Sequence, residues 1–307
     1  MANVLIGIIL VVRAILKDKI SARWYYAMWF LLIIKLIIPN LFKTPFNLIY
    51  LFKLAISKLS VDQGVGGSSN FYNLSRGNQN LTNIWPFPDE YALSINGNQT
   101  LPLLQILFCI WLIVLLCILA RTFIYNIEVW KTVKASKPIQ DEELCVIVEA
   151  CKEEMRIKDR IQIVESKNIQ IPALFGLFEP RIILPMNIKS VLSNKELKYV
   201  ILHEMVHHKR KDIFFNILTS FLQAIHWFNP IIRYGLYRMH EDQELACDFY
   251  VLNKIENEEH FYYGNTLIKL LKIARSSMYS FTMTNVVNKN RGIKERINMI
   301  SKFRAMK

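Results

Sequence analysis

The chain of 307 residues is long enough for one or two domains with a buried core. Hydrophobic residues make up 52% of it, and long apolar runs fill the first third and recur near position 110, as is typical of a membrane protein that carries a soluble domain. The formal net charge of +13 would suit nucleic acid, but the basic residues are spread along the chain. Because no helix-turn-helix, zinc-finger or RNA-binding pattern is present, we expect no direct contact with nucleic acid.

Three apolar segments predict membrane-spanning helices, at residues 4–16, 24–42 and 101–124. The first is short beside the ~20 residues that a spanning helix needs, and a signal peptide is its alternative interpretation. The lack of an A-x-A-like cleavage site and the closeness of the second segment argue against that alternative. A belt of tryptophan and tyrosine opens the second segment, and the third carries no charge until Arg121.

Lysine and arginine next to these segments set the predicted orientation. They gather at 17–23 and after residue 125, which places both stretches in the cytoplasm and the loop 43–101 outside the cell. We therefore predict a membrane domain, residues 1–125, and a cytoplasmic domain, residues 126–307.

The cytoplasmic part begins with short predicted elements: a helix at 141–152, a strand at 161–165 and a second strand unit at 172–185. Residues 213–227 predict a further, apolar helix, with Asp212 as its expected cap. Polar residues within this apolar helix favour a buried or membrane-apposed helix over a fourth span.

Residues 203–207, His-Glu-Met-Val-His, place two histidines one turn apart on one face of a helix, where both imidazoles can bind a single Zn²⁺. Glu204 would lie next to the open metal position, where a carboxylate can take a proton from water and pass it to a leaving amine. A surface helix with incidental histidines is the alternative. The helix itself is well indicated by an S-x-x-E capping box at Ser193 and Glu196 and by basic residues at its C-terminal end.

A catalytic zinc site needs a third protein ligand beside the two histidines. The next predicted helix presents His240, Glu244 and Asp248 four residues apart on one stripe. Spacing leaves both His240 and Glu244 open as the third ligand, and the stripe alone equally fits a solvated acidic face. Beside a histidine pair that lacks a ligand, we interpret the stripe as part of the metal site, with Asp248 accepting a hydrogen bond from a ligand histidine. Cys247 is one of five scattered cysteines that we interpret as free thiols.

Together these motifs resemble a known family. The pair at 203–207, the stretch His-Trp-Phe-Asn-Pro at 226–230 and the stretch Glu-Leu-Ala-Cys-Asp at 244–248 are similar to the BlaR/MecR-type membrane metallopeptidases, gluzincin sensor-transducers of bacteria. The stretch 174–185 and the span at 24–39 fit as well. The resemblance therefore covers nearly the whole chain, and the ordered set of motifs is far more specific than the histidine pair alone.

The resemblance implies an α-helical membrane domain and an α+β cytoplasmic zinc metallopeptidase domain of the gluzincin type. Zn²⁺ would be held by His203, His207 and Glu244. Glu204 would act as general acid and base, and Asp248 would support a ligand.

The resemblance also implies how a substrate binds. The strand formed by Arg181, Ile182, Ile183 and Leu184 would be the sheet edge to which an extended substrate adds as a further strand. Family members cut a cytoplasmic repressor, or themselves, after an outside signal, so the implied partners are a transcriptional repressor and the lipid bilayer of a bacterial cell. A homodimer fits the sequence without being required by it.

The family's sensor-transducers also carry a fourth span and an extracellular penicillin-binding sensor. These 307 residues contain neither, nor any S-x-x-K motif, so we expect no direct β-lactam sensing by them.

The motifs and the resemblance together imply a membrane-anchored zinc endopeptidase that cleaves a cytoplasmic regulatory protein, itself, or both, in signal transduction linked to antibiotic resistance. One alternative is a quality-control protease, which would make many cuts in misfolded membrane proteins. The other is a non-catalytic transducer, which has no need of an intact Glu204. The residues available to stabilise the oxyanion are His208, His226, His240 and Tyr250, and the sequence singles out none of them.

Overall fold

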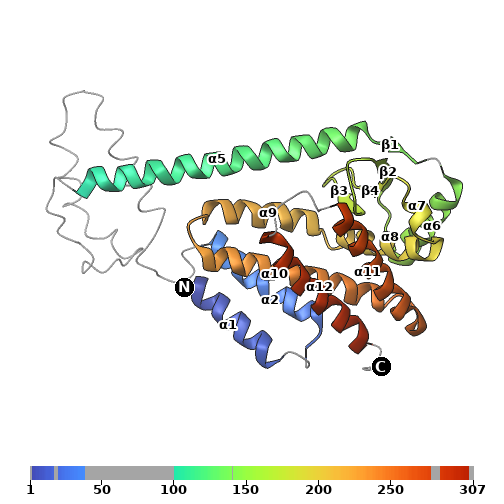
Figure 1. The fold of residues 1–307 in the computed structure, drawn as a ribbon. Coiled ribbons are helices and arrows are strands. Elements are labelled where there is room, and N and C mark those ends of the chain that lie inside the picture. The colour runs from blue at the N-terminus through green and yellow to red at the C-terminus, as the bar shows by residue number, and fades with distance from the viewer. Residues whose placement is uncertain (1, 17–19, 39–99, 140, 278–283, 304–307) are drawn as a thin grey trace, which may run out of the picture. The chain divides into compact units, whose positions relative to one another are not determined.

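The computed structural model describes residues 2–16, 20–38, 100–139, 141–277 and 284–303 (Figure 1). The chain divides into two compact units, Met1–Ile38 with Ile118–Lys307, and Pro39–Cys117. The predicted loop 43–101 lies outside the described residues except for Leu101 and its neighbour Thr100, which begin a helix. The first unit contains every predicted metal-site residue.

α5 (Thr100–Ala135) is the one helix in the described ranges that is long and apolar enough to cross a membrane. An 18-residue window within Gln105–Ala135 has a mean hydropathy of 2.6, and none of that window is buried. The helix predicted at 101–124 is therefore present and continues to Ala135. α1 (Ala2–Ile15) and α2 (Ala22–Ile37) have 14 and 16 residues, short of the ~20 that a spanning helix needs, so the three-span topology stays a prediction.

α1 and α2 pack against α10 (Pro230–Leu252), the helix that carries Glu244 (Figure 1). Their shared apolar core includes Ile6, Ile9, Trp29, Leu32, Leu236 and Met239. The helices approach closely at Gly235, where an added Cβ would lie 2.9 Å from Cδ1 of Ile6. The predicted division near residue 125 stays a prediction, but α1 and α2 lie in the same compact unit as the predicted metal site.

A small mixed sheet lies beside the helices, with strands β1 (Lys137–Pro138), β2 (Gln162–Ser166), β3 (Ala173–Phe175) and β4 (Arg181–Pro185). Their order is β1-β2-β4-β3; β2 and β4 are parallel, and the other two pairs are antiparallel. α6 (Glu142–Met155) connects β1 to β2, and Asp141 caps it by accepting a hydrogen bond from the Leu144 N–H.

The interior place of β4 corrects the prediction that Arg181–Leu184 forms a sheet edge. β4 is paired on both sides, and Ile182, Ile183 and Leu184 are at most 1% exposed. Consecutive large apolar residues are typical of a strand buried on both faces, so the residues themselves favour an interior strand. In the described sheet, β3 is the strand at that end of the order.

The remaining elements are helical: α7 (Ile188–Val191), α8 (Asn194–Lys209), α9 (Asp212–Ile225), α10, the 3₁₀ turn η4 (Asn257–Glu259), α11 (His260–Ser277) and α12 (Thr284–Phe303). The predicted capping box of α8 is confirmed, because the Ser193 Oγ accepts from the Glu196 N–H and the Ser193 N–H donates to the Glu196 carboxylate. α8 is buried along most of its length and so forms the centre of the unit.

α9 is the predicted apolar helix, and it is a 14-residue element. One side packs on α2, α8 and α10, while Phe214, Ile217 and Phe221 are exposed on another. The expectation that Asp212 caps α9 is wrong. The residue at the cap position is Lys211, with φ of 57°, and Asp212 is buried against the histidine motif.

Candidate metal centre

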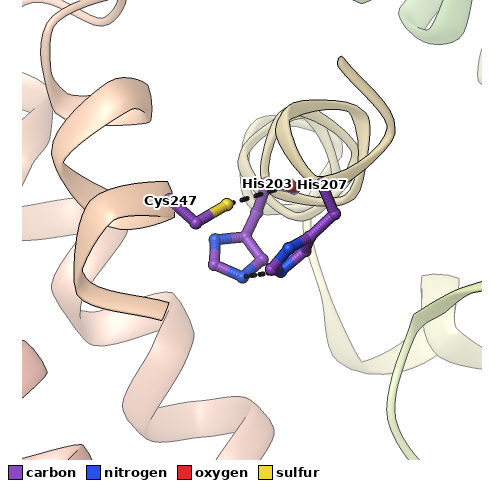
Figure 2. Close-up of side chains that lie close together, drawn as sticks. All are labelled: His203, His207 and Cys247. Carbon is purple, nitrogen blue, oxygen red and sulfur yellow. Dashed lines mark hydrogen bonds between the residues drawn. The ribbon is translucent and has the colours of Figure 1, made fainter. Parts of the chain in front are cut away.

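The two histidines of α8 meet in the interior of the protein. Their Nε2 atoms lie 3.2 Å apart, and Figure 2 shows the rings of His203 and His207 projecting from the same helix with these nitrogens facing each other. Two nitrogens bound to one tetrahedral Zn²⁺ at their usual distance would lie about 3.3 Å apart. The pair is therefore spaced as zinc ligands require.

Glu244 on α10 faces the same point. Its Oε2 lies 3.5 Å from His203 Nε2, and its Oε1 lies 3.5 Å from His207 Nε2. Burial opposes ionisation, but Arg296 and the two histidines outweigh it and hold the pKa of Glu244 well below its usual range. A charged carboxylate close to both imidazoles is the donor set that zinc prefers in a three-ligand site.

Cys247 is a second potential ligand on α10. Its sulfur and one ring nitrogen from each of His203 and His207 lie within 4.8 Å of one another, and Figure 2 shows the side chain approaching α8. The thiol donates a hydrogen bond to the His203 carbonyl oxygen, 3.3 Å away, so it is already engaged with the backbone of α8. We retain Glu244 as the predicted third ligand because it presents an oxygen to each Nε2 atom.

Each histidine turns its Nδ1 atom toward a buried carboxylate. Asp248 Oδ1 lies 3.3 Å from His203 Nδ1, and the Tyr263 hydroxyl, 3.0 Å from that nitrogen, donates to Asp248 over 2.6 Å. Asp212 Oδ2 lies 2.7 Å from His207 Nδ1. Such partners fix the ring orientation and leave Nε2 free for a metal. Sequence reasoning identified Asp248, took Asp212 for a helix cap and missed Tyr263.

The acidic surroundings of the histidines favour a cation. Burial lowers the pKa of His203 and of His207, but Cys247 and the carboxylates raise both well above the ordinary histidine value. Positive charge at the histidine pair is therefore favourable. Protonated imidazoles or a divalent metal can each provide it, and the two nitrogens at 3.2 Å favour the metal.

Glu204 lies on the same helix and lines a cleft of about 910 Å³ together with both histidines and Glu244. Burial raises the pKa of Glu204 above the usual range, although the two histidines lower it. A carboxylate of raised pKa next to a metal position is suited to accept and return a proton near neutral pH.

The strand residues predicted to bind substrate do not reach the cleft. Arg181, Ile182, Ile183 and Leu184 are absent from its lining, whereas Ile171–Leu174, which includes the start of β3, forms part of it. Of the four residues considered for the oxyanion, His240 lines the cleft. His208 pairs with Asp159, His226 binds the Leu222 carbonyl, and Tyr250 stacks with Lys209.

Arg296 on α12 is a site residue that sequence reasoning missed. Its Nε and Nη2 donate to Asp248 over 2.6 and 2.7 Å, and its Nη1 lies 2.9 Å from Glu244 Oε2. No local pattern indicates it, because α12 reaches the site only through the tertiary fold.

The chain is similar to known proteins along nearly its whole length. A family model described as BlaR1 peptidase M56 matches residues 1–300. The chain is 26% identical to Regulatory protein BlaR1 of Bacillus licheniformis over 303 residues, which is 97% of this chain and 49% of that protein. It is 26% identical to Methicillin resistance mecR1 protein of Staphylococcus aureus strain Mu50 over 305 residues, 98% of this chain and 50% of that protein. The chain thus spans about half the length of these curated relatives.

Proposed function

This chain belongs to the BlaR1 peptidase M56 family, and we propose that it is a membrane-anchored zinc endopeptidase that cleaves a cytoplasmic repressor, itself, or both, in signal transduction. The observation that carries the proposal is the convergence of His203, His207 and Glu244 beside Glu204 in one cleft. We assign the first three as zinc ligands and Glu204 as the general acid and base.

In this proposal the residues divide the work of peptide hydrolysis. Bound zinc would polarise the scissile carbonyl and acidify a water. Glu204 takes a proton from the attacking water and delivers it to the leaving amine. Asp248, Tyr263 and Asp212 hold the two imidazoles in orientation, so the ligands need little rearrangement during the reaction.

We propose β3, instead of β4, as the strand to which the substrate adds. β3 ends the described sheet, and its first two residues line the cleft together with Glu204, which supports this assignment. An extended peptide paired with this edge would form main-chain hydrogen bonds beside the proposed ligands.

We further propose that the chain is a multi-pass protein of the bacterial cell membrane. Its peptidase would lie in the cytoplasm, and its partner would be a cytoplasmic repressor. Support comes from the apolar helix α5, from the family match and from relatives whose names describe regulation and methicillin resistance.

Co-expression with cytoplasmic repressors tests the proposed substrate. Wild type, Glu204→Gln and the control Glu149→Gln, an exposed glutamate on α6, would each be produced with the repressor, and fragments identified by mass spectrometry. Wild type and Glu149→Gln should give one or few cuts, and Glu204→Gln none. Many cuts in misfolded membrane proteins would favour a quality-control protease. Signalling that survives Glu204→Gln would exclude proteolysis as its cause.

A further inference from the structure

Arg296 joins two carboxylates that stand one turn apart on α10. Its guanidinium donates twice to Asp248 and lies 2.9 Å from Glu244 Oε2. Asp248 has no exposed side-chain surface, and the arginine side chain is only 18% exposed. The Glu244 side chain is partly exposed, but two like charges at this spacing still repel each other, and a planar guanidinium both neutralises them and fixes their orientation.

These two carboxylates have different places at the metal centre. Glu244 is the proposed ligand, and Asp248 orients the ring of His203. Arg296 holds Oε2 of Glu244, which also lies 3.5 Å from His203 Nε2, and the other oxygen lies 3.5 Å from His207 Nε2, so the carboxylate stays directed at the histidine pair. One side chain from α12 thereby sets the position of a ligand and of a ligand's supporting group.

The neighbouring residue, Glu295, links α12 to the N-terminal helix. Its Oε2 lies 2.8 Å from Arg13 Nη2 on α1 and 3.3 Å from Arg238 Nη2 on α10. The same Arg13 nitrogen lies 2.8 Å from Asp242 Oδ1, and Trp29 of α2 donates to Asp242 Oδ2 over 2.8 Å. This ionic cluster therefore connects α1, α2, α10 and α12, and its member on α12 is Glu295, the residue before Arg296.

We propose that Arg296 is a positioning residue of the metal centre, and that the Glu295–Arg13 pair makes its position depend on the N-terminal helix α1. The inference rests on the proposed zinc site. A displacement of α1 would move Glu295, and with it the adjacent Arg296, away from Glu244 and Asp248. Zinc affinity would then depend on the position of α1, although α1 is linked to the ligands only through Glu295 and Arg296.

The test is zinc affinity of the full chain in detergent, measured by competition with a chromophoric chelator. Arg296→Gln should bind zinc about 10- to 100-fold more weakly, as other removals of a ligand's supporting group do. Arg296→Lys should be intermediate because it retains the charge without the planar fork. Lys294→Gln, an exposed position on the same helix, is the matched control and should bind like wild type.

Arg13→Gln and Glu295→Gln test the link to α1. Each should weaken zinc binding by roughly 2- to 30-fold, and the double variant by no more than the stronger single one. The visible spectrum of the cobalt-substituted chain is a second measurement, because it follows ligand geometry only in folded molecules. It should change in the Arg296 variants and stay unchanged in a variant that merely lowers stability.

Each outcome decides one part of the proposal. Wild-type affinity and an unchanged cobalt spectrum in Arg296→Gln, or in Arg296→Lys if the first variant does not fold, would overturn the positioning role. Weak binding in Arg296→Gln with unchanged binding in Arg13→Gln and Glu295→Gln would overturn the link to α1. A wild-type chain that binds no zinc would instead contradict the proposed function itself.

Discussion

α10 meets its neighbours on two sides that are built from different chemistry. On one side the carboxylates of Glu244 and Asp248 face the histidines of α8 and contact Arg296. On the other side Leu236 and Met239 pack against α1 and α2 in an apolar core. The polar contacts of the first side depend on the positions of particular atoms, while the packing of the second side depends on side-chain volume and buried area. Single substitutions should therefore separate metal binding from stability.

The largest effect should follow loss of a ligand. Glu244→Ala should lower zinc affinity by more than the roughly 100-fold expected when a residue that supports a ligand is removed. His240→Ala should largely retain zinc. His240 contacts Thr219 and Gln243 instead of the histidine pair. Metal content of the purified variants checks this, and the reverse pattern would overturn the assignment of Glu244.

Cys247 sharpens the same comparison, because it lies on α10 within reach of the histidines. Cys247→Ala should keep zinc, and the cobalt-substituted wild type should lack a thiolate charge-transfer band, since the thiol is bound to the His203 carbonyl. A strong band that disappears in Cys247→Ala would make the thiol a ligand.

Removing a partner of a ligand histidine should have a smaller effect. Asp212→Asn preserves the shape of the side chain but weakens the contact with His207 Nδ1, so zinc affinity should fall about 10- to 100-fold. Titration with a competing chelator measures it, with Asp159→Asn, on the surface pair with His208, as the control. Equal affinities for both variants would show that Asp212 does not support the site.

The apolar contacts of α10, unlike the Glu295–Arg13 pair, should respond in stability alone. Leu236 is fully buried between α10 and the N-terminal helices, so Leu236→Ala should lower the free energy of unfolding by about 2–5 kcal/mol. Denaturant unfolding measures the loss. Zinc affinity of the folded variant should match wild type, and a 10-fold weaker affinity would show that the two sides of α10 are not separable.

Asp242 is a buried charged residue of the ionic cluster beside the apolar core, and it makes stability there depend on pH. Burial raises its pKa to about 6, against the opposing effects of Arg13 and Trp29. The folded state therefore binds a proton more tightly than the unfolded state, and this group's contribution falls as pH rises from about 4 to 6. Relative to Asp242→Asn, metal-free wild type should lose on the order of 2–3 kcal/mol across that range. Parallel pH profiles for the two proteins would contradict the shifted pKa.

Local patterns were sufficient for the parts of the site that lie on one helix. The spacing of His203 and His207, the capping box of α8 and the stripe with Glu244 each depend on neighbours three or four residues away. Tyr263 and Arg296 could not be predicted in this way, because they reach the site from helices far along the chain.

The strand assignment failed for a related reason. We expected Arg181–Leu184 to form the sheet edge. Long-range pairing decides which strand lies at an edge, and here β4 pairs with β2 on one side and with β3 on the other. The uninterrupted apolar run of β4 did carry a signal of an interior strand.

We propose that Glu204 performs chemistry at a zinc centre that it does not help to hold. Zinc content and cleavage rate measured together on purified Glu204→Gln test it most directly. The variant should retain zinc at the wild-type stoichiometry while the rate constant for cleavage falls about 10²- to 10⁴-fold. Cleavage at the wild-type rate by a zinc-loaded Glu204→Gln chain would contradict the account.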